Sequence, residues 1–138
     1  MKTKLYEIPG KLEGYYYPEN NLIIDHWTNL SVTFEEWKST IYDIGILDFA
    51  AKNQVKFWIT DSSEATGVFK SEIQEFREST SSHDMAKSGI QQYFTVLPKN
   101  SSISKLSLRT TSKAYSGRGA MLSHAVETME EAMEMIRQ

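Results

Sequence analysis

The stretch Val55–Phe69 constrains the fold more than any other part of the chain. An apolar run over 55–60 stops abruptly at Asp61, Ser62 and Ser63, and a helical pattern follows soon after. A buried strand of an α/β sheet delivers a polar turn in this way to the edge where such folds bind ligands. The stretch therefore predicts an α/β fold with a candidate site at residues 61–63, although it does not indicate which reaction or ligand this site serves.

Hydrophobic periodicity predicts an order of strands and helices along the whole chain. After a lead-in over residues 1–14, two strands flank Pro18–Asn21 and predict an antiparallel hairpin, and strands then alternate with helices. This order favours a mixed, mostly parallel sheet of about five strands with about four helices, in one domain over residues 15–138. The predicted strands are 15–17, 21–28, 55–60, 93–97 and 121–126, and the predicted helices are 33–51, 71–89, 103–115 and 129–136.

Local sequence signals support two of these helices and interrupt a third. Thr33 with Glu36, and Thr128 with Glu131, have the spacing of capping boxes at helix starts. The hydroxyl-rich run 79–82 competes with the backbone for hydrogen bonds, so a kink or break is expected within the helix 71–89. The first helix is expected to continue past Gly45.

Composition excludes several classes of protein. The chain has 138 residues and no cysteine, so thiolate catalysis, thiolate metal sites and disulfides are excluded, which fits a reducing cytoplasm. The N-terminal sequence lacks the continuous apolar core of a secretory signal, and no apolar run approaches the ~20 residues of a membrane-spanning helix. We therefore expect a cytoplasmic protein with no integral membrane contact.

Charge is distributed unevenly along the sequence. No Asp or Glu occurs between Met85 and Val126, while six basic residues do. On a helix, Lys105, Arg109 and Lys113 would form one stripe with Arg118 beyond its end, which suits an anionic small ligand, a lipid head group or an acidic protein. Solvated lysines on an ordinary surface explain the same pattern. Nucleic acid is disfavoured because the pI is about 5.6 and no aromatic residues interleave the basic ones.

The three histidines give no metal or catalytic signature. His26, His83 and His124 have no metal-ligand spacing, and Asp25 and His26 would point to opposite faces of a strand. A Ser–His–Asp triad can be assembled from Ser63, a histidine and Asp61 or Asp25, but no nucleophile-elbow motif accompanies it. No metal, cofactor or catalytic residue is therefore assigned, and a hydrolase is the weakest of the functional alternatives. The aromatic residues Tyr15–Tyr17, Trp27, Trp37 and Trp58 are interpreted mainly as core.

Several phrases of the sequence resemble the STAS domain, and more closely the small stand-alone bacterial proteins called SpoIIAA-like. They are LIIDHWTNLS after the hairpin, TFEEWKSTI, VKFWITD, YFTVLP and VETMEEAMEMI. The resemblance runs from about Tyr15 to the C-terminus. It implies a small mixed sheet with helices packed on it, and protein–protein regulation without catalysis.

The same resemblance suggests a modification site. Anti-sigma factor antagonists of this family carry Asp-Ser-Ser-Gly after a strand, and their second serine accepts a phosphate, which corresponds to Ser63 here. A phosphate at a helix N-terminus would meet free amides. Glu64 replaces the family's glycine, and a polar turn held by Asp61 is the alternative interpretation. The leading hypothesis is a regulatory module that binds an unknown protein, with homodimerisation through a strand edge or helix face also compatible; the alternative is a binder of small anions or lipids.

Overall fold

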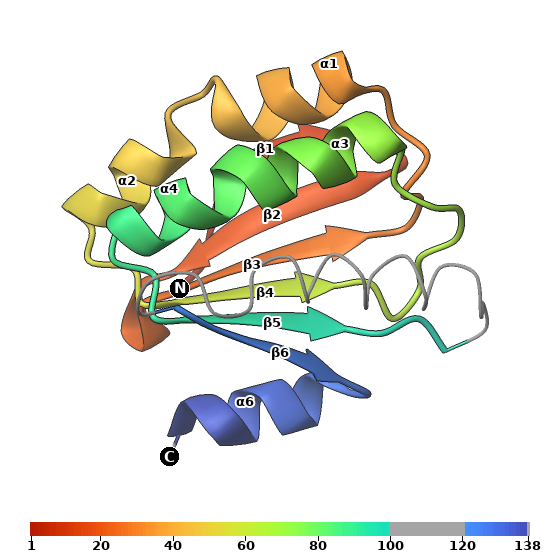
Figure 1. Cartoon of the computed structure of the whole chain (residues 1–138). Coiled ribbons are helices and arrows are strands. Elements are labelled where there is room, and N and C mark those ends of the chain that lie inside the picture. The colour runs from red at the N-terminus through yellow and green to blue at the C-terminus, as the bar shows by residue number, and fades with distance from the viewer. Residues whose placement is uncertain (100–120, 138) are drawn as a thin grey trace.

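A six-stranded mixed sheet forms the centre of the computed structural model, which describes residues 1–99 and 121–137 (Figure 1). The strands lie in sequence order, β1-β2-β3-β4-β5-β6. The first three pair antiparallel, and β3 to β6 pair parallel, so the predicted α/β class and mixed sheet are confirmed. Their bounds are β1 Thr3–Ile8, β2 Leu12–Tyr17, β3 Leu22–Trp27, β4 Phe57–Asp61, β5 Gln92–Val96 and β6 Leu122–Val126.

The N-terminal segment belongs to the sheet, so its prediction as a lead-in was wrong. β1 forms a hairpin with β2, and its Tyr6 and Ile8 are each only 6% exposed. A register shift between Lys4 and Tyr6 marks a bulge in this hairpin. The sequence hides the strand because its buried positions are few and charged residues lie between them. The sheet therefore has six strands, where about five were expected.

Helical segments cover one face of the sheet as two crossovers (Figure 1). Between β3 and β4 the chain forms α1 (Phe34–Trp37), a π-helical turn η2 (Lys38–Tyr42) and α2 (Ile46–Lys52). Between β4 and β5 it forms α3 (Ser71–Phe76), a second π-helical turn η3 (Arg77–Ser81) and α4 (Ser82–Lys87). The opposite face carries α6 (Met129–Arg137). The predicted helix over 103–115 lies outside the described residues.

Local signals explain where these helices begin and where they are interrupted. The Thr33 hydroxyl accepts from the Glu36 amide at 3.0 Å, and the Glu36 carboxylate accepts from the Thr33 amide at 3.1 Å, which confirms the capping box. The expected continuity past Gly45 was wrong, because this residue adopts φ +80° and starts a new helix, α2. The hydroxyl-rich run 79–82 overlaps the π-helical turn η3, so the hydrogen-bond pattern of the helix changes there, but the expected break does not occur.

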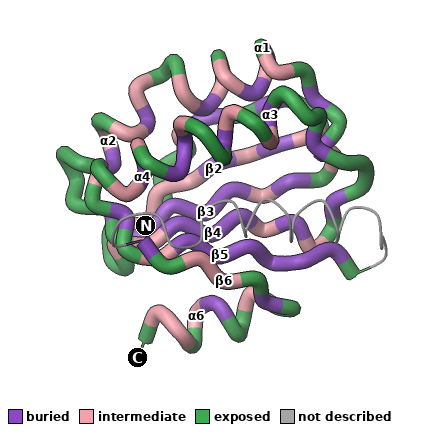
Figure 2. Tube along the Cα trace, viewed as in Figure 1, coloured by how far each residue is buried: buried purple, intermediate pink, exposed green. Residues whose placement is uncertain are grey.

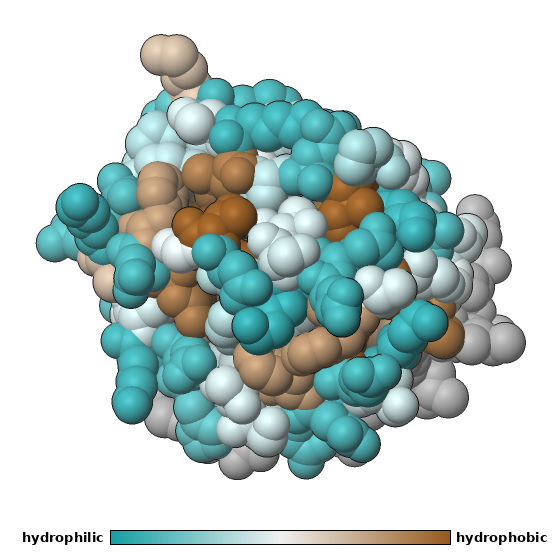
Figure 3. Space-filling model, turned by 90° about the horizontal axis from the view of Figure 1, so that it is seen from above, coloured by the Kyte–Doolittle hydropathy of each residue, from teal (hydrophilic) through white to brown (hydrophobic). Residues whose placement is uncertain are grey.

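Two hydrophobic clusters fill the two faces, and the strands between them are the most buried part of the molecule (Figure 2). The larger cluster lies under α1–α4 and includes Trp27, Trp37 and Trp58, each less than 5% exposed, as predicted for core residues. The smaller one joins α6, through Ala132, to Ile59 and neighbouring strand residues. The outer surface of the helix layer mixes hydrophilic and hydrophobic side chains (Figure 3). In the described part of the chain, no helix is both long and apolar enough to cross a membrane.

Candidate functional site

The carboxyl ends of β3 and β4 bring His26 next to Asp61 and Ser63, which lie more than thirty positions further along the sequence. Asp61 ends β4 and lies beside His26 of β3 in the parallel register. One carboxylate oxygen, Asp61 Oδ2, lies 2.9 Å from His26 Nδ1. The other, Asp61 Oδ1, accepts from the Ser63 amide at 3.1 Å and from the Ser63 hydroxyl at 2.8 Å. We call these three residues the strand-end cluster.

Backbone hydrogen bonds join the loop 61–66 to the end of β5 on one side and to the segment that follows β3 on the other. The Ser62 amide donates to the carbonyl of Val96 at the end of β5, at 3.1 Å. On the other side, the Thr66 amide donates to the Thr28 carbonyl at 3.1 Å, and the Leu30 amide donates to the Thr66 carbonyl at 2.9 Å. Because both sides of the loop are tied to the sheet, the cluster sits on a rigid platform.

The strand-end cluster opens onto a polar surface of β1 and β2. The side chain of His26 is 42% exposed and that of Asp61 is 14% exposed. The Tyr15 ring lies edge-on to the His26 ring at 6.2 Å between centroids. The Tyr15 hydroxyl donates to Glu13 at 2.5 Å, and the Lys2 ammonium lies 4.4 Å from the Tyr15 ring centroid. An approaching molecule would therefore meet both signs of charge here.

Hydrogen bonding sets the charges within the cluster. Burial would raise the pKa of the Asp61 carboxyl, but the hydrogen bonds from His26 and Ser63 outweigh it, so the pKa lies below its ordinary value. The hydrogen bond to Asp61 raises the pKa of the His26 imidazole, against the opposing effect of burial. The imidazolium–carboxylate pair therefore persists to higher pH than it would for a histidine without this partner, and Ser63 is bonded to the carboxylate.

This order of contacts differs from a hydrolytic triad. The Ser63 hydroxyl bonds to Asp61, whereas a nucleophilic serine bonds to the histidine that removes its proton. His83 lies exposed on α4, and His124 on β6 pairs with Gln92 at 3.0 Å. Within residues 1–99 and 121–137, no three His, Asp or Glu side chains gather closely enough to hold a metal ion.

Ser63, the residue that the resemblance suggests as a phosphate acceptor, does not lie at a helix N-terminus. Helix α3 begins at Ser71, and its N-cap is Lys70. Ser63 therefore lies in a turn well before the helix, and the expected help from a helix N-terminus does not apply. The basic residues predicted for anion binding, Lys105, Arg109, Lys113 and Arg118, lie outside the described residues.

A second polar cluster lies on the other face of β3, inside the larger hydrophobic core. As predicted for neighbours on a strand, Asp25 points away from His26 and is only 3% exposed. The Tyr6 hydroxyl donates to Asp25 Oδ2 at 2.8 Å, and the Trp58 indole nitrogen donates to the same oxygen at 3.3 Å. Burial raises the pKa of Asp25, while hydrogen bonds and the charge of Arg77 act in the opposite direction.

Arg77 supplies the opposite charge to this core polar cluster. It is 6% exposed and donates to the Tyr93 hydroxyl at 2.7 Å, and that hydroxyl lies 2.5 Å from the Thr60 hydroxyl. The guanidinium carbon lies 5.1 Å from the centroid of the Phe69 ring. Sequence reasoning missed this cluster, although one signal was present. Asp25 stands at a core position of an apolar strand, and Arg77 follows the buried Ile73 by four residues on the same helix face.

Comparison with known proteins supplies no family for this chain. No protein-family model matches it, and no curated protein matches it at a significant level.

The His26–Asp61 contact makes a direct prediction for titration. The imidazole of His26 is expected to titrate above the ordinary value of 6.5, and Asp61→Asn should lower its pKa. Because this pKa is higher in the folded state, the stability that it contributes is present at low pH and is lost as pH rises through it. NMR of the histidine ring protons measures the pKa of His26 in the wild type and in Asp61→Asn. His124, whose pKa burial lowers, is the internal control and should not respond to Asp61→Asn.

Proposed function

We propose that this chain is a non-enzymatic, STAS-like regulatory module of the bacterial cytoplasm, which binds another protein through the strand-end cluster and the loop 61–66. The contact of the Ser63 hydroxyl with a charged, partly exposed carboxylate–imidazole pair carries the proposal. The loop is held rigidly, and its residues Glu64 and Thr66 are exposed. Rigid loops at the carboxyl edge of parallel strands are favourable places for recognition.

Phosphorylation of Ser63 would act on this surface by repulsion. A phosphoryl group adds a charge of about −1.5 to −2 near pH 7. It would replace the hydroxyl hydrogen that Ser63 donates to Asp61 Oδ1 at 2.8 Å, so this hydrogen bond would be lost and the two negative groups would repel each other. The phosphate would also compete with Asp61 for the imidazolium of His26. We therefore propose that the unmodified form binds the partner and that modification releases it.

The test compares four forms of the immobilised protein in extracts of the source organism. Ser63→Asp introduces a negative charge, Ser63→Ala removes only the hydroxyl, and Ser39→Asp adds the same charge on the exposed surface of η2. The wild type, Ser63→Ala and Ser39→Asp should retain one common partner that Ser63→Asp loses at least tenfold. Thermal unfolding of each variant verifies that the loss does not come from misfolding.

Mass spectrometry of the protein isolated from its own cells completes the test. A phosphatase-sensitive mass increase that maps to Ser63 is expected for a fraction of the molecules. The proposed switch is wrong if all four forms retain the same proteins and Ser63 carries no phosphate under any growth condition.

A further inference from the structure

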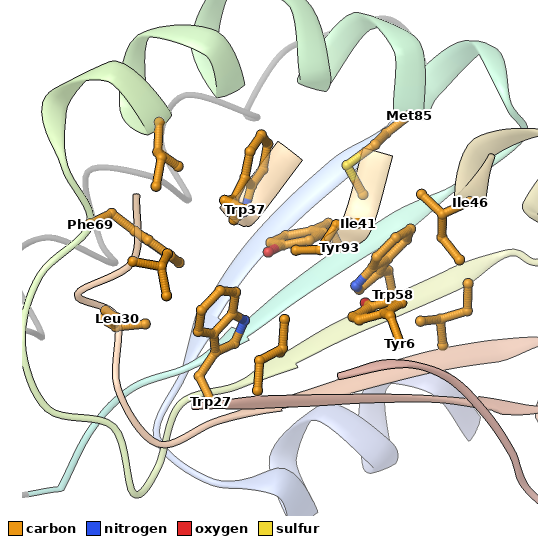
Figure 4. Packing of buried hydrophobic residues seen from close by; sticks show 14 of the residues in the cluster. Tyr6, Trp27, Leu30, Trp37, Ile41, Ile46, Trp58, Phe69, Met85 and Tyr93 are labelled. Carbon is orange, nitrogen blue, oxygen red and sulfur yellow. The ribbon is translucent and has the colours of Figure 1, made fainter. Parts of the chain in front are cut away.

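A cavity lies inside the larger core, between the helix layer and the sheet. Its volume is about 20 Å³, which is enough for at least one water molecule. Figure 4 shows Trp37, from the helix layer, together with Tyr93 and Trp58 of the sheet. These three rings line the cavity, with Asp25 and Arg77 as its charged residues. The lining is thus mostly apolar, and its polar residues are Asp25, Thr60, Arg77 and Ser81.

One wall of the cavity has an unsatisfied hydrogen-bonding atom. Asp25 Oδ1 is buried and has no hydrogen-bond partner among the described residues. Thr60 of β4 lies beside Asp25 in register, and Thr95 of β5 lies beside Thr60. The Thr95 hydroxyl is likewise buried without a partner in the described part of the chain. A buried acceptor left unpaired is costly, and sites of this kind are normally completed by ordered water or a ligand.

The helix layer is irregular where it meets this cavity. The π-helical turn η2 contributes Ile41 and Tyr42 to the lining, and η3 contributes Arg77 and Ser81. A π-helical turn inserts an extra residue and is rare, and it occurs frequently at functional sites. Two such turns, in neighbouring helical segments, line the same cavity. This observation concerns the helix layer and is independent of the unpaired carboxylate oxygen.

The charges around the cavity specify the kind of molecule that fits. Arg77 is a cation that lies among these aromatic rings. Its guanidinium carbon is 5.9 Å from the centroid of the Trp37 ring and 6.0 Å from the centroid of the Tyr93 ring. Its charge acts on Asp25 in the direction that favours the carboxylate, so an occupant need carry no charge of its own. An ionised carboxylate only accepts hydrogen bonds, so an occupant that pairs with Asp25 Oδ1 in this form must donate one.

We propose that this cavity is a binding site for a small, uncharged hydrogen-bond donor that bonds to Asp25 Oδ1. Solvent water and a small organic molecule of the same chemistry are its two sources. The site lies on the opposite face of the sheet from the strand-end cluster and does not depend on the function proposed for that cluster.

Two measurements on the full chain distinguish the two sources. Native mass spectrometry of the purified protein detects a retained organic molecule as an adduct. NMR detects a long-lived water through a nuclear Overhauser effect to the indole N–H of Trp58, which donates to Asp25. Either an adduct or this water signal is expected, and Asp25→Leu should remove it. Asp25→Asn, which keeps an acceptor oxygen, should retain it.

Two control variants test whether the water signal comes instead from exchange with a nearby hydroxyl, and xenon binding tests whether the cavity is dry. Tyr6→Phe and Thr60→Val remove hydroxyls near Asp25, and a signal lost in either variant would come from hydroxyl exchange and would overturn the proposal. If Asp25→Leu fails to fold, xenon binding to the wild type decides instead. The proposal is also overturned if no adduct and no water signal are found, or if xenon fills the cavity, since xenon favours dry apolar space.

Discussion

Replacement of Gly14 by alanine is expected to destabilise the protein by about 3 kcal/mol, close to the sum of overpacking and a lost buried hydrogen bond. The Tyr6 ring crosses β2 over Gly14 to reach Asp25, and a Cβ at position 14 would lie 2.3 Å from Tyr6 Cε1 and Cζ. The ring must therefore leave the core, and the Asp25 carboxylate loses a donor. Chemical denaturation measures the change in the free energy of unfolding.

A double-mutant cycle isolates the cause of this effect. In a Tyr6→Ala background the added methyl group meets no ring, so Gly14→Ala should cost less than 1 kcal/mol there. Gly10→Ala is a comparison without crowding, because nothing lies within 4 Å of a Cβ at that turn position, although its φ of +75° disfavours alanine. Equal costs of Gly14→Ala with and without the Tyr6 ring would show that the close approach is unimportant.

Replacement of Arg77 by leucine is expected to cost about 3 kcal/mol at pH 7, because it removes a buried hydrogen-bond donor and the positive charge that favours the Asp25 carboxylate. The variant also loses the hydrogen bond to Tyr93 and the stacking over Phe69. The double variant Arg77→Leu/Asp25→Asn should recover part of this loss, since the unpaired charge is then removed. Arg137→Leu, at an exposed site on α6, should stay within about 0.5 kcal/mol of the wild type.

The pH dependence of the Arg77 variant has a defined sign. The folded-state pKa of Asp25 is raised, so folding is favoured when this group is protonated, and that stability is lost as pH rises through its pKa. Without Arg77, which acts to lower this pKa, the loss should continue to higher pH. The gap between wild type and Arg77→Leu should therefore narrow as pH falls towards 4. A gap that is constant from pH 7 to pH 4 would mean that the two charges do not interact.

Much of the fold could be predicted because its signals are local. The run 55–60, the Thr33 capping box and the hairpin turn at 18–21 each depend on neighbouring residues, and each corresponds to an observed element. Strand β1 could not be predicted, because its Tyr6 is buried through a contact with Asp25, nineteen positions away. The helix break at Gly45 was missed because the apolar pattern continues across it.

In the candidate sites, too, residues close together in the sequence could be predicted, whereas contacts between distant residues could not. Asp61 and Ser63 were found because they follow a strand and lie two positions apart. The pairing of Asp61 with His26 depends on the parallel register of β3 and β4, which single-sequence patterns do not contain. The core polar cluster joins β1, β3, β4, β5 and a π-helical turn, so only its unusual buried charges were visible in the sequence.

Photo-crosslinking tests directly whether a protein partner docks at the loop 61–66. A photoreactive residue would replace the exposed Glu64 in the loop or, as the control, the exposed Gln91 just before β5 at the other end of the strands. In cells of the source organism, position 64 should yield one discrete protein adduct that disappears with Ser63→Asp and persists with Ser63→Ala. A lack of adducts at position 64, or the same adduct at position 91, would contradict the claim.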